Sequence, residues 1–156
     1  MRIRSSTSLW LAAGLAGVLL AFAPPGDARA RPKRSADVII KSVEVKMTKE
    51  ILTPWDTGTE ANRPPDLYVE IAVLGAGDTK PFRTAVKEDT FTAKFDVKTV
   101  RVTESDVLKI AVYDKDLKSN DVVGKYTKKI TTDTPRERTV NWSFDQVTAL
   151  ALEFQP

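Results

Sequence analysis

Apolar and polar residues alternate with a period of two over most of the chain from Val38 onward. In one stretch, Val43, Val45 and Met47 alternate with Glu44 and Lys46. Side chains of a β-strand point alternately to its two faces, so this pattern buries one face and exposes the other to water. After the first 30 residues the sequence has no apolar run at helical spacing. The chain is therefore predicted to be all-β.

Eight segments with this alternation are separated by turn-rich stretches. We expect strands at residues 38–47, 67–74, 82–87, 91–97, 107–113, 122–130, 138–144 and 147–154. Short strands in this number predict a sandwich or barrel of antiparallel strands. Strands do not alternate with helical segments, which excludes a doubly wound nucleotide-binding fold.

The first 30 residues have the pattern of a secretory signal peptide. Arg2 and Arg4 precede an apolar run of about fifteen residues, and the segment ends in the small-residue sequence Ala28-Arg29-Ala30. A retained membrane helix is the alternative, but it needs roughly 20 apolar residues. We therefore expect a signal peptide helix at 1–30, a disordered linker at 31–37 and one domain at 38–156, exported to the periplasm or secreted.

Composition excludes several classes of function. Removal of the signal peptide takes away Arg2, Arg4, Arg29 and Asp27, so the net charge falls from +3 to +1. Nucleic acid is then an unexpected partner, because it requires a concentrated basic face. The chain contains neither cysteine nor histidine, which excludes thiolate nucleophiles, Ser-His triads and the usual zinc sites. Any metal would have to bind through oxygen.

Three aspartates occur close together in the sequence VYDKDLKSNDVVG, residues 112–124. Asp114 and Asp116 follow a predicted strand, and Asp121 precedes the next one. Residues two apart on an extended chain point to the same side, and calcium binds six to eight oxygen ligands. An ordinary turn is the alternative, because Asp, Asn and Ser favour turns on backbone grounds. An EF-hand is excluded, because its glycine and final glutamate positions would be Ser119 and Lys125.

A second acidic segment strengthens the metal interpretation. Asp56 and Asp66 lie in a proline-containing stretch that leads into the strand expected at 67–74. Two acidic loops at strand ends could meet at one edge of a sandwich. Asp56 is ten residues from Asp66, so Glu60 or a backbone carbonyl is an alternative ligand.

Two sequence stretches, PDLYVEI at 65–71 and VYDKD through DVVG at 112–124, resemble those of the C2 domain, a calcium-dependent lipid-binding β-sandwich. The resemblance extends from about Val38 to Phe154 and implies an eight-stranded antiparallel Greek-key sandwich. It also implies that calcium is held by two acids of the first loop and three of the third. In this chain those ligands are Asp56, Asp66, Asp114, Asp116 and Asp121.

The resemblance implies a binding module that attaches to an anionic phospholipid membrane or to a protein partner. In metal-free loops, clustered negative charges repel phosphate, and bound calcium reverses that sign. The alternative is a structural or adhesive sandwich in which calcium only rigidifies the loops or is absent. An enzyme is not expected, because the acids lie at turns and the short chain offers no evident substrate cleft.

Overall fold

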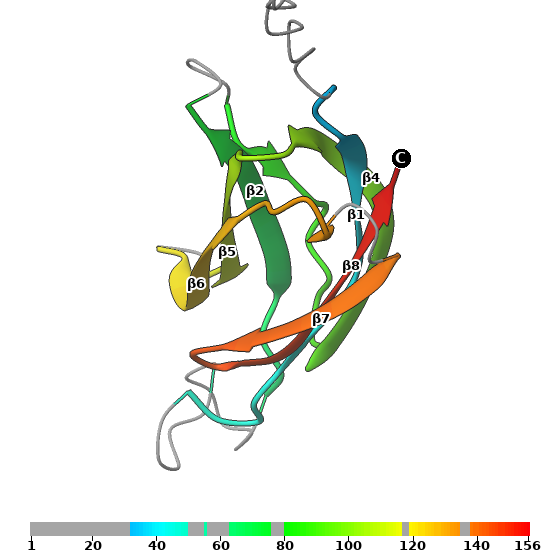
Figure 1. Cartoon of the computed structure of the whole chain (residues 1–156). Helices are drawn as coiled ribbons and strands as arrows, with labels where there is room; N and C mark the ends of the chain where they lie inside the picture. The colour runs from blue at the N-terminus through cyan, green and yellow to red at the C-terminus, as the bar shows by residue number, and fades with distance from the viewer. Residues whose placement is uncertain (1–31, 50–54, 56–62, 76–79, 117–118, 135–137) are drawn as a thin grey trace, which may run out of the picture. The chain divides into compact units, whose positions relative to one another are not determined.

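A computed structural model describes residues 32–49, 55, 63–75, 80–116, 119–134 and 138–156. The chain divides into two units, Met1–Arg31 and Pro32–Pro156, and the following description concerns the second. Within its described residues this unit is nearly all β, and eight strands form two antiparallel sheets, which confirms the predicted all-β antiparallel sandwich (Figure 1). None of the helices in the described ranges is long and apolar enough to cross a membrane.

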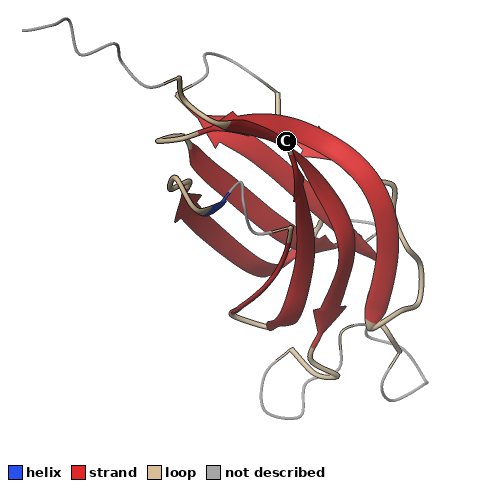
Figure 2. Cartoon of the chain, turned by 45° about the vertical axis from the view of Figure 1, so that its right-hand side comes forward, coloured by secondary structure: helices blue, strands red, loops and turns tan. Residues whose placement is uncertain are grey.

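The two sheets have four strands each, and all their pairings are antiparallel (Figure 2). The first sheet has the order β4-β1-β8-β7, and the second has the order β3-β2-β5-β6. The strands are β1 (Ser35–Val45), β2 (Leu67–Leu74), β3 (Phe82–Arg83), β4 (Thr92–Thr103), β5 (Val107–Asp114), β6 (Asp121–Lys129), β7 (Thr139–Phe144) and β8 (Val147–Gln155).

The core lies between the sheets and consists of the apolar positions of the period-two pattern. Burial of this apolar surface is the main favourable term in folding. In β2 and β5, alternate residues face inward and are fully buried. They are Leu67, Val69, Ile71, Leu108, Ile110 and Val112. The sheet of β1 and β8 contributes the opposite side, with Val38, Ile40, Val43, Leu150, Leu152 and Phe154.

The largest differences from the predicted strand bounds occur in β1, β3 and β4. β1 begins at Ser35, so the segment 31–37, expected to be a disordered linker, ends in strand. Ser35–Asp37 is held there by pairing with β4, and Ala36 is completely buried. β3 is limited to Phe82–Arg83, shorter than the expected 82–87. β4 continues to Thr103, six residues beyond the expected end at 97.

Irregular pairing explains the unexpected length of β4. Its register with β1 shifts twice, and each shift places an extra residue in β4. Asp96 has a φ of 50° at one shift. An extra residue shifts the alternation by one position, and near Thr99 the inward-facing side changes from odd positions such as Ala93 to even positions such as Val102. In the sequence, this change of phase resembles the end of a strand.

Candidate functional site

Three connections meet at one end of the sandwich. They are the β1–β2 connection (46–66), the β3–β4 connection (84–91) and the β5–β6 connection (115–120). The amide of Lys115 donates a 2.8 Å hydrogen bond to the carbonyl of Asp66, and the amide of Thr90 donates one of 3.0 Å to the carbonyl of Pro65. Segments far apart in the sequence are therefore joined at this end by backbone hydrogen bonds.

Asp114 is the innermost acid at this end. It is the last residue of β5 and continues the inward-facing series of Ile110 and Val112, so its side chain is fully buried. Its Oδ1 accepts a 2.8 Å hydrogen bond from the amide of Asp66. Asp114 is paired with Leu67 of β2 on one side and with Asp121 of β6 on the other. The strand register therefore brings Asp66, Asp114 and Asp121 to one end of the second sheet.

The carboxylate of Asp66 contacts the β3–β4 connection. Its Oδ1 accepts a 2.8 Å hydrogen bond from the amide of Asp89, a residue with a φ of 47°. The carboxylate of Asp89 in turn accepts a 2.9 Å hydrogen bond from Nε of Arg63. In this arrangement Asp66 stabilises a left-handed turn, a conformation that Asp tolerates better than most residues.

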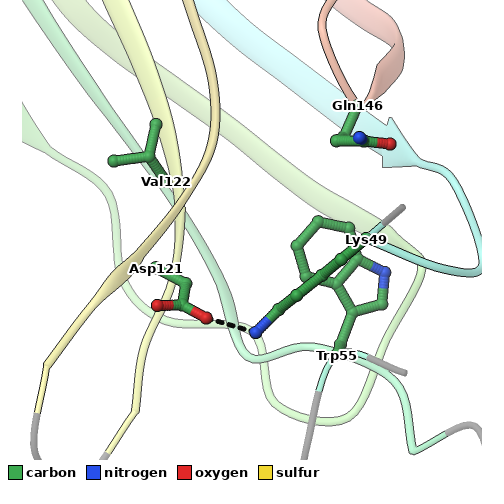
Figure 3. Close-up of a pocket in the computed structure, with 5 residues that line it drawn as sticks. All are labelled: Lys49, Trp55, Asp121, Val122 and Gln146. Atoms are coloured by element: carbon green, nitrogen blue, oxygen red, sulfur yellow. Dashed lines mark hydrogen bonds and ion pairs between the residues drawn. The ribbon is translucent and has the colours of Figure 1, made fainter. Parts of the chain in front are cut away.

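Asp121 forms an ion pair with the ammonium group of Lys49, a residue of the β1–β2 connection (Figure 3). The same ammonium lies 5.6 Å from the ring centroid of Trp55. Trp55 is buried, and its indole N–H donates a 2.8 Å hydrogen bond to the carbonyl of Lys46. These side chains line a pocket of about 210 Å³ together with Val122 and Gln146.

The other two predicted ligands lie differently. Asp116 is partly exposed and lies two residues beyond the end of β5. Asp56, with its alternative Glu60, is outside the described residues. Four of the five predicted ligands therefore lie at the common end within the described residues, three of them placed by the strand register and Asp116 placed by the β5–β6 connection.

The donor chemistry at this end fits calcium, because carboxylate and carbonyl oxygens are the ligands that calcium prefers. Within the described part of the chain, however, no group of three or more acidic side chains is placed to hold a metal ion. Asp66 and Asp121 also have the protein partners given above. The described acids thus provide suitable donors, but they do not form a complete coordination shell in the arrangement seen.

Sequence reasoning missed Lys49 and Asp89. Lys49 is one of several lysines near the end of β1, and Asp89 is one of two consecutive acids after β3. The contact between Lys49 and Asp121 spans 72 positions of the sequence and depends on the path of a loop. For Asp89, the neighbouring Glu88 and Thr90 indicate a polar turn, but they do not indicate its hydrogen bond to Asp66.

An aromatic cluster occupies the outer face of the second sheet. The rings of Tyr68 and Tyr113 stack with centroids 5.0 Å apart, and the guanidinium of Arg83 lies 4.7 Å from the ring centroid of Tyr68. Arg83 also pairs with Glu70. Burial raises the pKa of both tyrosine hydroxyls above the ordinary value of 10.0, so both remain neutral near pH 7.

Comparison with known proteins gives one family and a set of structural neighbours. Residues 40–143 match the C2 domain family, whereas no curated protein matches the chain. A calcium-bound structure of two C2 domains of extended synaptotagmin 2 is 18% identical, with a TM-score of 0.57, over 80% of this chain and 46% of that one. A C2 domain of plant extended synaptotagmin 1 is 14% identical, with a TM-score of 0.52, over 81% of this chain and 97% of that one.

A third neighbour is human GIVD cytosolic phospholipase A2 in complex with an inhibitor and terbium chloride. It is 16% identical, with a TM-score of 0.56, over 79% of this chain and 17% of that one. The chain spans less than half of the extended synaptotagmin 2 structure and about a sixth of the phospholipase. At these identities the structural likeness shows the fold alone.

Proposed function

The chain belongs to the C2 domain family, and we propose that it is a calcium-dependent binding module for an anionic phospholipid surface. The surface that makes the attachment is the end of the sandwich at which the three connections meet. The observation that carries the proposal is the hydrogen bond from the amide of Asp66 to Asp114, which joins the two acidic segments.

The acids proposed to hold calcium are Asp56, Asp66, Asp114, Asp116 and Asp121. Calcium held by these acids would supply positive charge at this end and would bind phosphate oxygens as additional ligands. Without it, the carboxylates at this end repel an anionic surface. Asp114 is buried and Asp116 is partly exposed, so the two differ in what they contribute. Asp114 orders the loops through Asp66, and Asp116 is nearer to solvent and to a ligand.

Two apolar side chains at the same end support a membrane as the target. Met47 of the β1–β2 connection is 68% exposed, and Val122, next to Asp121, is 50% exposed. Each buried CH₂ group contributes about 0.8 kcal/mol, so insertion of both side chains into the headgroup boundary would add to the electrostatic attraction.

Vesicle cosedimentation tests this function. We expect the protein to sediment with vesicles of phosphatidylserine and phosphatidylcholine in millimolar calcium and to remain in solution with a chelator. Asp116→Asn should weaken sedimentation, because it removes one acid near the loops. Glu44→Gln removes an exposed acid of β1 and should have no effect. Equal sedimentation with calcium and with chelator would contradict the proposal.

A second function is favoured by the absence of a three-acid group among the described residues and by the ion pair of Asp121 with Lys49. In this alternative the domain is a structural or adhesive module that binds a protein, and calcium only rigidifies the loops or is not bound. Vesicles would then fail to sediment the protein under either condition. Calcium titration by calorimetry would give no heat, or a heat without any change in vesicle binding.

We propose that residues 1–30 direct export and are removed, and that the domain acts by binding rather than by catalysis. Amino-terminal sequencing of the protein recovered from the periplasm or medium tests the first part. A first residue near Arg31 is expected, and an intact Met1 would contradict cleavage.

A further inference from the structure

Lys49 is a positively charged group in contact with an acid that we propose to be a calcium ligand. Its ammonium pairs with Asp121 and lies 5.6 Å from the ring centroid of Trp55 (Figure 3). The Lys49 side chain is only 25% exposed. It is therefore partly enclosed in the pocket, unlike a lysine that extends into solvent.

The indole of Trp55, which lies against Lys49, is held in place by the fold. Trp55 is 2% exposed, and its indole N–H is bound to the carbonyl of Lys46. A cation over the face of a tryptophan is attracted by the electrons of the ring. The indole and the carboxylate of Asp121 thus hold the ammonium from two sides, and both partners come from segments that the sandwich brings together.

A divalent cation bound at Asp121 would compete with this ammonium. Two cations close to one carboxylate repel each other, and their repulsion is stronger in a partly enclosed site than in bulk water. Departure of Lys49 would remove this repulsion and release Oδ2 of Asp121 for the cation. The adjoining pocket of about 210 Å³ gives room for an ion with water ligands once the lysine has left, since a water occupies about 30 Å³ in the liquid.

We infer that Lys49 is a tethered counter-ion of the loop site, which occupies the carboxylate of Asp121 and lowers its affinity for divalent cations. This inference rests on the proposed function and adds a regulatory element to it. A divalent cation that binds Asp121 then replaces the ammonium of Lys49. The affinity for the cation therefore depends on the difference between the free energy of its interaction with Asp121 and that of the ion pair of Lys49 with Asp121.

Lys49→Met tests the inference, because methionine removes the charge and keeps an unbranched apolar chain over Trp55. Calorimetric titration of the full-length protein with calcium chloride should show binding tighter by up to about fivefold, the upper end of what one surface ion pair contributes. Lys49→Arg retains the charge and should bind like the wild type. Lys46→Met removes an exposed charge three residues away in the same connection and should also leave the affinity unchanged. Thermal melting in chelator verifies that each variant is folded.

The outcomes separate the inference from the proposed function. If Lys49→Met binds calcium and the wild type does not, the inference holds, and the proposal that the wild-type chain acts in a calcium-dependent way is wrong. If the wild type binds calcium and Lys49→Met binds no tighter, or Lys46→Met gains as much, the inference is wrong and the proposed function stands. If neither the wild type nor Lys49→Met binds calcium, both are wrong.

Discussion

Asp114 is expected to be required for stability as well as for any metal. It is fully buried, and its Oδ1 accepts the hydrogen bond from the amide of Asp66. Asp114→Ala leaves that amide without this acceptor and should lower the free energy of unfolding by about 1–3 kcal/mol, measured by urea denaturation in chelator. Asp114→Asn keeps an acceptor oxygen and should cost less. Equal stability of Asp114→Ala and the wild type would contradict this role.

At the end of the sandwich that carries Asp66 and Asp114, some side-chain contacts were predictable from the sequence and others were not. Asp66 and Asp114 were expected to meet because each lies at the end of a recognisable strand, and adjacent strand ends share an edge. The partners Asp89 and Lys49 were not predicted. Asp89 is placed by a backbone turn with positive φ, and Lys49 is placed by a connection whose path the alternation pattern does not specify.

At the scale of elements, β6 and β7 belong to different sheets and approach each other at Gly124. A methyl group at Gly124 would lie 3.0 Å from two ring carbons of Phe144 and 3.2 Å from Val147. The ring of Phe144 is itself stacked on Tyr126, with centroids 5.2 Å apart. Gly124→Ala should therefore destabilise the domain by about 1–3 kcal/mol through overpacking, measured by urea denaturation.

The stability effect of Gly124→Ala should also be measured in a chain that carries Phe144→Leu. The smaller side chain removes the ring atoms that the methyl group meets, so the effect of Gly124→Ala should be smaller in that background. An equal loss in both backgrounds would show that the contact with Phe144 is not the cause.

The pairing of β1 with β4 carries an ionic contact whose contribution depends on pH. Lys98 lies 2.7 Å from Asp37, and Arg101 lies 3.5 Å from it. The hydrogen bond from Lys98, supported by the charges of Lys98 and Arg101, holds the pKa of Asp37 below its ordinary value of 3.8. A lowered pKa in the folded state contributes stability that is present above the ordinary value and is lost as pH falls through the folded value.

Asp37→Asn should therefore melt at a lower temperature than the wild type at pH 7, and the difference should shrink as the pH falls below about 3.8. Calorimetric melting curves across this range measure the effect. Glu88→Gln, which changes an exposed acid of the β3–β4 connection, should show a smaller difference at pH 7. A difference between Asp37→Asn and the wild type that persists at low pH would indicate a cause other than the charge of Asp37.

The elements were predictable to the extent that their alternation is uninterrupted. β2 was predicted with its observed bounds, because Leu67, Val69, Ile71 and Val73 recur at every second position. The prediction ended β4 at 97, because the alternation of burial changes phase near Thr99, at one of the two register shifts. Tertiary pairing with β1 maintains the strand through these irregularities, and pairing is not visible in a single segment of sequence.

At the scale of the whole molecule, the sandwich joins connections that are distant in the sequence into one surface. Asp66 and Asp114 are 48 positions apart, and Lys49 and Asp121 are 72 positions apart. Unfolding separates these residues. An ion that binds them together is therefore expected to bind the folded chain and not the unfolded one, so calcium affinity and domain stability are thermodynamically linked.

Calcium should raise the melting temperature of the domain by an amount that depends on the free calcium concentration relative to the dissociation constant. At a free concentration 100 times the dissociation constant, the free energy of unfolding rises by about 2.7 kcal/mol, which for a domain of this size is a shift on the order of 10 °C. Scanning calorimetry in calcium and in chelator measures it. Asp121→Asn should reduce the shift, whereas Glu44→Gln, on the exposed face of β1, should retain it. An equal shift in Asp121→Asn and the wild type would mean that calcium stabilises the domain at another place.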